Sequence, residues 1–252
     1  MSYSSERKNK YLFGMFLIIV IPIAIILYFV LYTAPTCSDG KFNQGEEGID
    51  CGGPCELVCS FKTADPIVKW SRAVETTQDV YGAVALIENT NMFAEAYNLS
   101  YVFKLYDSNG ILINERFGKA YIPNNLIFPI FEGNLQVGNR IPTKASFEFI
   151  EKASWREVTE LNEKIVLSNI EYVEKNKSPR VLAKIENKSV RDVRDLELIV
   201  LLYDTDNNLV NSSKTIIDSL KKDSSQNLIF TWPELFEKEV IKIDIVPVSK
   251  LN

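Results

Sequence analysis

The first part of the chain is dominated by an uncharged apolar run. Residues 11–32 read YLFGMFLIIVIPIAIILYFVLY, and at about 1.5 Å per residue a helix of that length crosses the ~30 Å hydrocarbon core of a bilayer. Pro22 lies near the middle of the run. In lipid the rest of the backbone has no water to bond to, so a kinked helix is still the best available state. The run therefore predicts one transmembrane helix at 11–32.

The charges beside this run predict its orientation. Arg7, Lys8 and Lys10 precede it, whereas the segment that follows it is mainly acidic. The positive-inside bias makes 1–10 a cytoplasmic tail and places the chain after the run outside the cell membrane. A cleaved signal peptide is the alternative, but its apolar region usually has ~7–15 residues. We therefore expect a single-pass anchor in membrane lipid with extracytoplasmic C-terminal domains.

The remaining chain alternates apolar and polar positions in two long stretches. The apolar positions are Tyr97, Leu99, Tyr101, Phe103 and Leu105 in the first and Leu196, Leu198, Val200 and Leu202 in the second. A period of two over this length predicts half-buried strands. Further strands are expected at 67–74, 80–88, 120–130, 145–151, 165–173, 180–186, 226–232 and 240–246. The only helix expected after the membrane segment lies in a connector at 153–164.

An internal repeat organises these strands. ALIEN at 85–89 recurs as AKIEN at 183–187, and LYD at 105–107 recurs as LYD at 202–204. The spacing of about 100 residues is that of a domain, because solenoid repeats are usually ~20–50 residues long. Asn109-Gly110, directly after the first LYD, is typical of a hairpin turn.

Short strands at this spacing predict a mainly β fold with two tandem immunoglobulin-like antiparallel β-sandwiches. We expect the first at 66–152 and the second at 165–252, after the N-terminal transmembrane helix and a small cysteine-rich juxtamembrane module at 33–60. Each sandwich is expected to fold separately.

All four cysteines lie in the cysteine-rich module, at Cys37, Cys51, Cys55 and Cys59. An even number of cysteines in a short polar segment on the oxidising side of a membrane predicts two disulfides. Three pairings are possible, and the spacing does not choose among them. A zinc site with four thiolate ligands is the alternative, although the spacing lacks the paired short hairpins of zinc ribbons.

The same segment contains oxygen ligands that suit calcium. Asp39, Asn43, Glu46 and Asp50 are spaced three or four residues apart in a glycine-rich loop, and hard oxygen ligands are those that Ca²⁺ takes in proteins. The register is not that of an EF-hand. Calcium is the one metal that we assign here, and no other cofactor is expected.

Two stretches resemble known modules. Residues 37–59 follow the pattern CxDGxxNxxExGxDCGGxCxxxC of a cysteine-rich module of bacterial surface proteins, and FKLYD at 103–107 spells the motif of FxLYD-type domains, which are small β-sandwiches of prokaryotic envelope proteins. The second copy reads VLLYD at 200–204, without the aromatic residue. With the anchor, the chain resembles a family of bacterial membrane-anchored surface proteins. This resemblance implies an extracellular location and no catalytic role.

Composition narrows the function classes further. The chain has no histidine, which excludes Ser-His-Asp and Cys-His catalysis as well as histidine-ligated metals. A net charge of −5 argues against nucleic acid as a partner, because phosphate binding needs a basic surface. No catalytic residue is therefore assigned, and we expect the protein not to be an enzyme.

The function expected from the sequence is that of a binding or structural module held outside the cell membrane, with an envelope protein or a glycan as its partner. The alternative is an accessory subunit of a membrane-embedded envelope complex. The loops at 88–96 and 188–195 follow equivalent strands, so they should lie at corresponding ends of the two sandwiches. They are the first choice for a contact surface.

Overall fold

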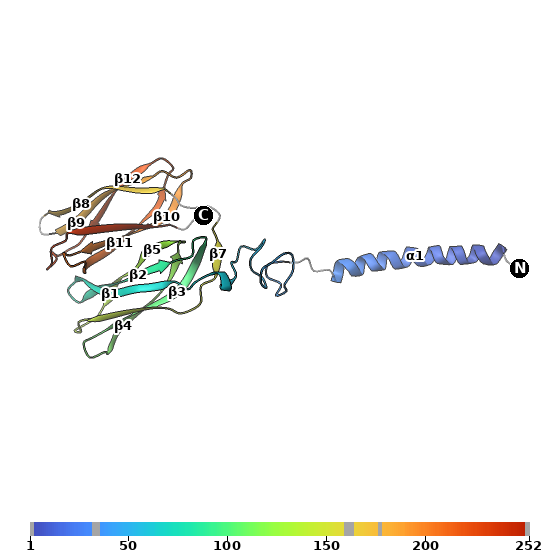
Figure 1. The fold of residues 1–252 in the computed structure, drawn as a ribbon, viewed down its shortest axis with the longest axis horizontal. Coiled ribbons are helices and arrows are strands. Elements are labelled where there is room, and N and C mark those ends of the chain that lie inside the picture. The colour runs from blue at the N-terminus through green and yellow to red at the C-terminus, as the bar shows by residue number, and fades with distance from the viewer. Residues whose placement is uncertain (1–2, 32–35, 159–163, 176–177, 250–252) are drawn as a thin grey trace. The chain divides into compact units, whose positions relative to one another are not determined.

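The computed structural model describes residues 3–31, 36–158, 164–175 and 178–249. The chain divides into two units, residues 1–55 and residues 56–252. The first contains helix α1 (Tyr3–Leu31) and the loops that follow it. The second contains all thirteen strands found in the described ranges. In Figure 1 the strands carry the labels used below. Predictions for 32–35 and 159–163 lie outside the described residues.

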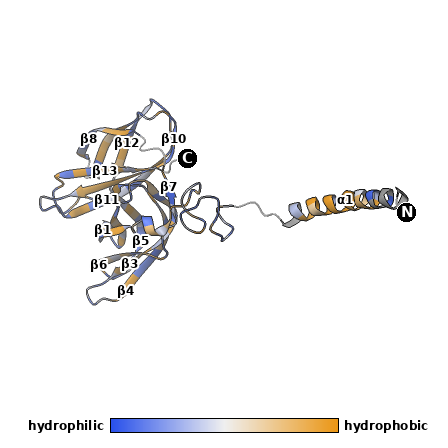
Figure 2. Ribbon diagram, turned by 45° about the vertical axis from the view of Figure 1, so that its right-hand side comes forward, coloured by the Kyte–Doolittle hydropathy of each residue, from blue (hydrophilic) through white to orange (hydrophobic). Residues whose placement is uncertain are grey.

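Helix α1 contains residues 11–31 of the apolar run found in the sequence, with Pro22 inside it. Residues Lys10–Tyr28 are long and apolar enough to cross a membrane, and a signal sequence near an N-terminus has the same properties. Figure 2 shows the contrast between the hydrophobic stretch of α1 and its more hydrophilic N-terminal part. The side chains described between Lys10 and Tyr28 are largely exposed within the structure.

The first half of the second unit has two antiparallel sheets. One has the order β1–β2–β5 and the other β4–β3–β6, with β7 also paired to β3. The short helix η1 (Ser60–Lys62) precedes them. The strand bounds are β1 (Ile67–Thr77), β2 (Val80–Asn89), β3 (Ala94–Tyr106), β4 (Leu112–Ile122), β5 (Leu126–Gln136), β6 (Lys144–Phe149) and β7 (Trp155–Glu157).

The second half repeats this topology. Its sheets have the orders β8–β9–β12 and β11–β10–β13, which match the first half strand for strand. The bounds are β8 (Ile165–Lys175), β9 (Ser178–Asn187), β10 (Val193–Tyr203), β11 (Leu209–Leu220), β12 (Ser225–Thr231) and β13 (Lys242–Val248). The predicted fold class, a mainly β chain with antiparallel sandwiches after an apolar helix, is confirmed.

The alternating positions form the two cores. In β3, Leu99, Tyr101, Phe103 and Leu105 are buried, and in β10 the side chains of Leu196, Leu198, Val200 and Leu202 are fully inaccessible. Each strand contains one residue with positive φ: Asn98 in β3, where the register of pairing with β4 shifts, and Asp195 in β10. Asn and Asp tolerate that conformation better than most residues.

Two sequence predictions were wrong in detail. The strand expected at 120–130 is the end of β4 and the start of β5, separated at Pro123, Asn124 and Asn125; Pro123 has no N–H to donate to a ladder, and Asn125 has a φ of 44°. The helix expected at 153–164 is replaced, over its described part, by strand β7. Trp155 is buried there and pairs with Ala96 of β3.

The two halves share a third apolar cluster. Val74, Val84 and Phe131 of the first half pack with Ile199 and Leu201 of the second, and all five are buried. Asn211 of β11 adds a polar contact, since its Nδ2 donates to the backbone oxygen of Glu75 at 2.7 Å. Separate folding of the halves, as the sequence predicts, would expose this cluster. The predicted domain boundaries stay a prediction.

Candidate functional site

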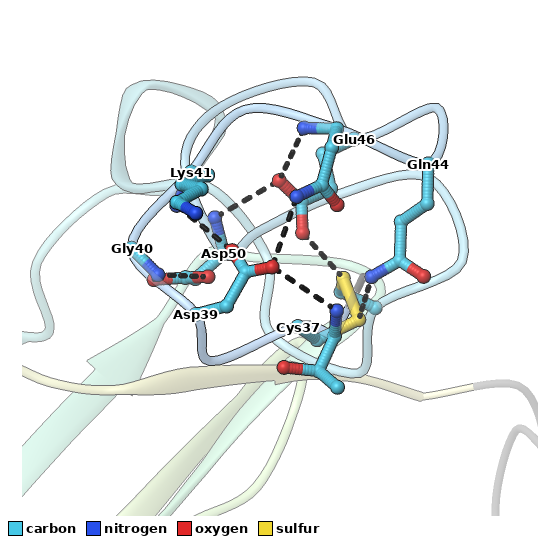
Figure 3. Close-up of a disulfide and its surroundings, with 10 residues drawn as sticks. Cys37, Asp39, Gly40, Lys41, Gln44, Glu46 and Asp50 are labelled. Carbon is cyan, nitrogen blue, oxygen red and sulfur yellow. Dashed lines mark hydrogen bonds between the residues drawn. A yellow bond between two sulfur atoms is a disulfide. The ribbon is translucent and has the colours of Figure 1, made fainter. Parts of the chain in front are cut away.

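The cysteine-rich module is closed by two disulfides, and no cysteine is free. Cys37 pairs with Cys55, with a Cα–Cα distance of 5.6 Å, and Cys51 pairs with Cys59. This selects one of the three pairings that the sequence left open. Because every sulfur is bonded to another sulfur, the module offers no thiolate to zinc. Figure 3 shows the first disulfide and the acidic loop around it.

Two of the predicted calcium ligands accept hydrogen bonds from backbone N–H groups. Asp39 Oδ1 accepts a hydrogen bond from the N–H of Lys41 at 2.9 Å, and its Oδ2 accepts one from Asn43 Nδ2 at 3.0 Å. Both carboxylate oxygens of Asp50 lie 3.0–3.1 Å from the backbone nitrogen of Gly40. The bond from Asn43 is the main reason that the pKa of Asp39 lies below its ordinary value.

Glu46 joins two parts of the loop through hydrogen bonds to its carboxylate. Its side chain is buried, and Oε2 accepts hydrogen bonds from the backbone N–H groups of Asn43 and Asp50, both at 3.3 Å. Its Oε1 lies 3.5 Å from Cys55 Sγ, a disulfide sulfur with no proton to donate. Gly53 has a φ of 60°, and a Cβ on it would lie 2.2 Å from the oxygen of Gly45, so glycine is required there.

The four predicted calcium ligands therefore lie in one loop, but three carboxylates already accept N–H groups, which carry the same sign of partial charge as a cation. One oxygen stands apart: Asn43 Oδ1 is buried and has no hydrogen-bond partner within the described part of the chain. A geometric cluster of Cys37, Glu46 and Cys55 also exists, but its sulfurs are bonded to each other. Calcium binding at Asp39, Asn43, Glu46 and Asp50 stays a prediction.

The asparagine that ends each repeated motif is buried, and its side chain donates hydrogen bonds to two backbone oxygens. Asn89 Nδ2 donates to the backbone oxygens of Ala94 and Pro123, at 3.0 and 2.8 Å. Asn187 Nδ2 donates to Arg191 and Leu220, both at 2.9 Å. These are corresponding positions of the two copies. In each copy this one side chain fixes the loop that follows the strand, so the motif is explained by structure.

The aspartate of each LYD motif closes the following turn. Asp107 Oδ1 accepts from the N–H groups of Asn109 and Ile111, both at 2.9 Å. Asp204 Oδ1 likewise accepts from Asp206 and Asn208, at 2.9 and 2.8 Å. The repeated aspartates thus have the same role in the two copies, and that role is structural.

These bonds change the acidity of the two aspartates. The N–H of Ile111 is the largest cause that lowers the pKa of Asp107. Burial raises the pKa of Asp204, but hydrogen bonds from Asn208 and from the Lys238 ammonium outweigh it and bring that pKa to about 2. Both carboxylates are therefore stabilised in their charged form.

The two predicted contact loops lie at one end of the second unit. The N–H of Asn125 donates to the oxygen of Asn91 in the first loop at 2.9 Å. Asn125 also lines a groove of about 250 Å³ whose lining includes Ile165. Ile165 pairs with Asn187, directly before the second loop. The expectation of corresponding ends agrees with this arrangement, while a binding role for the loops stays a prediction.

Strand β3 also contains a buried carboxylate that the sequence does not predict. Glu95 of β3 is only 6% exposed. Its Oε1 accepts the hydroxyl of Tyr97 at 2.6 Å, and its Oε2 accepts the hydroxyl of Tyr121. Burial is the main cause that raises the pKa of Tyr97, followed by its bond to Glu95. A glutamate between two alanines gives no sign of this environment, because Tyr121 comes from the neighbouring strand β4 and the burial depends on the fold.

Comparisons with known proteins give no family. No family model matches the chain, and no curated protein matches it. Among solved structures it is similar to a β-glucuronidase from Bacteroides uniformis, at 11% identity over 68% of this chain and 26% of that chain, with a TM-score of 0.23.

A second similar structure is a β-glucuronidase from glycoside hydrolase family 2, at 10% identity over 86% of this chain and 29% of that chain, with a TM-score of 0.20. The chain thus spans less than a third of the length of either enzyme. Likeness this low carries no argument about activity.

Proposed function

We propose that this protein is a non-enzymatic module of the cell envelope. It is anchored in the membrane by α1 and presents its second unit, residues 56–252, outside the cell. We call this second unit the β unit. The protein would bind a protein or glycan of the envelope, or hold a structural position there. The observation that carries the proposal is the succession of an apolar helix, a module closed by two disulfides and a β unit of two similar sandwiches.

Each part supports the proposal in a different way. Disulfides persist in oxidising compartments and are rare in the cytosol, so a doubly bridged module favours an extracytoplasmic position. Basic residues before the helix favour a cytoplasmic N-terminus. The repeated residues Asn89 with Asn187 and Asp107 with Asp204 are explained by the loops and turns that they stabilise. No nucleophilic thiol or histidine is available for catalysis.

Orientation is tested by adding protease to intact cells that express the chain with an epitope at either end. We expect the protease to remove an epitope placed after Asn252 and to spare one placed before Tyr11. Permeabilised cells serve as the control, because both epitopes should then be cleaved. Protection of the C-terminal epitope in intact cells would contradict the outward orientation.

The binding class is tested by proximity labelling from the β unit in native cells. A reproducible envelope partner, lost when the β unit is removed and the anchor kept, is the expected result. A partner retained by the anchor alone would favour the accessory subunit of a membrane complex. Turnover of a substrate by the full chain, abolished by one side-chain change, would contradict the non-enzymatic proposal.

A further inference from the structure

The first residues of the β unit and the first contact loop, 88–96, lie together at one end of the unit. Asn91 accepts a hydrogen bond from the N–H of Ala64 and donates one to its oxygen, both at 2.8 Å. The N–H of Val158, just after β7, donates to the oxygen of Phe93 at 2.9 Å. Figure 1 shows β7 at the end of the unit where the chain enters. We call this the entry end.

The second contact loop belongs to the same end. Asn124 Nδ2 donates to the oxygen of Met92 at 2.8 Å, and Asn124 shares a groove with Ile165. The N–H of Lys188, next to Asn187, donates to the oxygen of Lys164 at 2.8 Å, so the loop that carries Val190 starts beside this groove.

The entry end exposes apolar side chains at its tips. Phe61 of η1 is 70% exposed, Met92 and Phe93 are 55% and 52% exposed, and Val190 is 84% exposed. Met92 and Val190 occupy corresponding positions of the repeat, three residues after the buried asparagines. Loop tips are commonly polar, and apolar residues gathered at one end of a fold indicate a surface that is covered in use.

The length of the chain limits what can cover this surface. Cys37 comes six residues after Leu31, the last residue of α1, and the disulfide holds Cys37 and Cys55 at a Cα–Cα distance of 5.6 Å. Even a fully extended chain spans only ~3.6 Å per residue, so Glu56 stays within about 30 Å of the end of the apolar helix. The disulfide removes the long loop 38–54 from this tether. A bilayer crossed by α1 is then always within reach at high effective concentration.

We propose that the entry end rests on the outer surface of the bilayer that α1 crosses, with Phe61, Met92, Phe93 and Val190 inserted into the interfacial region. This inference depends on the proposed function, because it needs the anchor. The binding partner of the contact loops is then the lipid surface. A protein partner at these loops is the competing outcome.

Apolar insertion, and not charge, drives the contact. The exposed charged residues that the structure describes near these tips carry both signs, among them Lys62, Lys164, Lys188, Asp65, Glu157 and Asp192. Surface charge is screened by salt, whereas burial of apolar area is not. The contact should therefore form on zwitterionic lipid and persist at high salt.

The test uses the full chain reconstituted in phosphatidylcholine vesicles, with acyl chains either unmodified or brominated. Phe61→Trp, Met92→Trp and Val190→Trp each place a fluorophore at the entry end. Gln78→Trp is the matched control, because Gln78 is an exposed residue in the turn between β1 and β2. The length of β2 separates this turn from Asn89 by about 30 Å.

We expect brominated lipid to quench the added tryptophan at positions 61, 92 and 190, with a blue-shifted emission, and to leave that of Gln78→Trp unchanged. Trp70, Trp155 and Trp232 give a constant background that the unsubstituted chain measures. If the added tryptophans of all four variants responded equally to brominated lipid, while the protein stayed in the vesicles after alkaline washing, the lipid contact would be overturned and the anchor would be left intact. Loss of the quenching at high salt would overturn apolar insertion as its cause.

Release of the full chain by alkaline washing would be a different failure. It would show that α1 does not anchor the protein, and the proposed function and the lipid contact would both fall. The two failures are distinguishable because the washing step reports on the anchor and the quenching reports on the entry end.

Discussion

The two halves of the β unit have the same strand order but different cores. In the first half, Phe103 of β3 stands opposite Phe147 of β6, and their ring centroids are 4.9 Å apart. At the corresponding place in the second half, Val200 of β10 stands opposite Ile245 of β13. A cross-strand aromatic pair is thus replaced, on both strands at once, by an aliphatic pair.

The polar contacts are conserved where the core is not. Asn89 and Asn187 make the same pair of hydrogen bonds to backbone oxygens, and Asp107 and Asp204 close the same turn. A core tolerates different side chains as long as its volume is filled, but a buried backbone group needs a donor or acceptor at a fixed place. The comparison therefore indicates that the asparagines and aspartates specify the topology, whereas the core side chains fill the interior volume.

The largest effect is expected from truncating the aromatic pair. Phe103→Ala should lower the free energy of unfolding by ~3–5 kcal/mol, as deletions of buried Phe do. Val200→Ala should cost about 2 kcal/mol, because fewer buried CH₂ equivalents are lost. Urea unfolding of the full chain in detergent measures both. Equal costs would mean that the two cores do not differ in the way the pairs suggest.

The same measurement shows whether the halves unfold together. Because Val74, Val84 and Phe131 share a buried cluster with Ile199 and Leu201, we expect one transition in each variant. Two resolved transitions, only one of which shifts with Phe103→Ala, would instead support the separate folding that the sequence predicts.

A smaller and equal effect is expected at the asparagines. Asn89→Ala and Asn187→Ala each leave two backbone oxygens without their donor, which should cost about 2–3 kcal/mol in each half. Asn227→Ala, at an exposed position of β12, is the control and should have almost no effect. A large cost in one copy and none in the other would break the equivalence of the two networks.

The smallest effect concerns acid stability. The pKa of both Asp107 and Asp204 is lowered in the folded protein, so their stabilisation is fully present above the ordinary pKa of 3.8 and is lost as the pH falls through the lowered pKa. Asp204→Asn should lower the melting temperature at neutral pH, and its difference from the unsubstituted chain should shrink below pH 3.8 and vanish only below the folded pKa of about 2. Asp107→Asn should show the same sign and a smaller shift. A difference independent of pH would contradict this role of the charge.

Much of this architecture could be predicted from the sequence. The apolar run, the alternation in β3 and β10 and the repeated motifs indicate the helix, the cores and the duplication. The sequence also contains a sign of the interface between the halves, which the alternation of apolar and polar positions does not show. Residues 198–202 read LIVLL, a continuous apolar run, and such a run indicates a strand buried on both faces. Ile199 and Leu201 bury the second face of β10.

Other features needed the fold itself. The sequence WRE of β7 is too short to show a strand period, and it pairs only because Trp155 is buried beside β3. Glu95 depends on tyrosine hydroxyls from its own strand and from β4. In the cysteine-rich module, the spacing of oxygen residues predicts a cation site, whereas the backbone places N–H groups against the same carboxylates. Backbone direction in a loop is not encoded in side-chain spacing.

The account rests on the cysteine-rich module lying in an oxidising compartment beside the membrane. The most direct test is peptide mapping of the full chain taken from native membranes, with thiols blocked at lysis and no reductant added. We expect no blocked cysteine and two disulfide pairs, Cys37 with Cys55 and Cys51 with Cys59. Blocked thiols at these four positions would contradict it, because a reduced module would place the β unit on the cytosolic side.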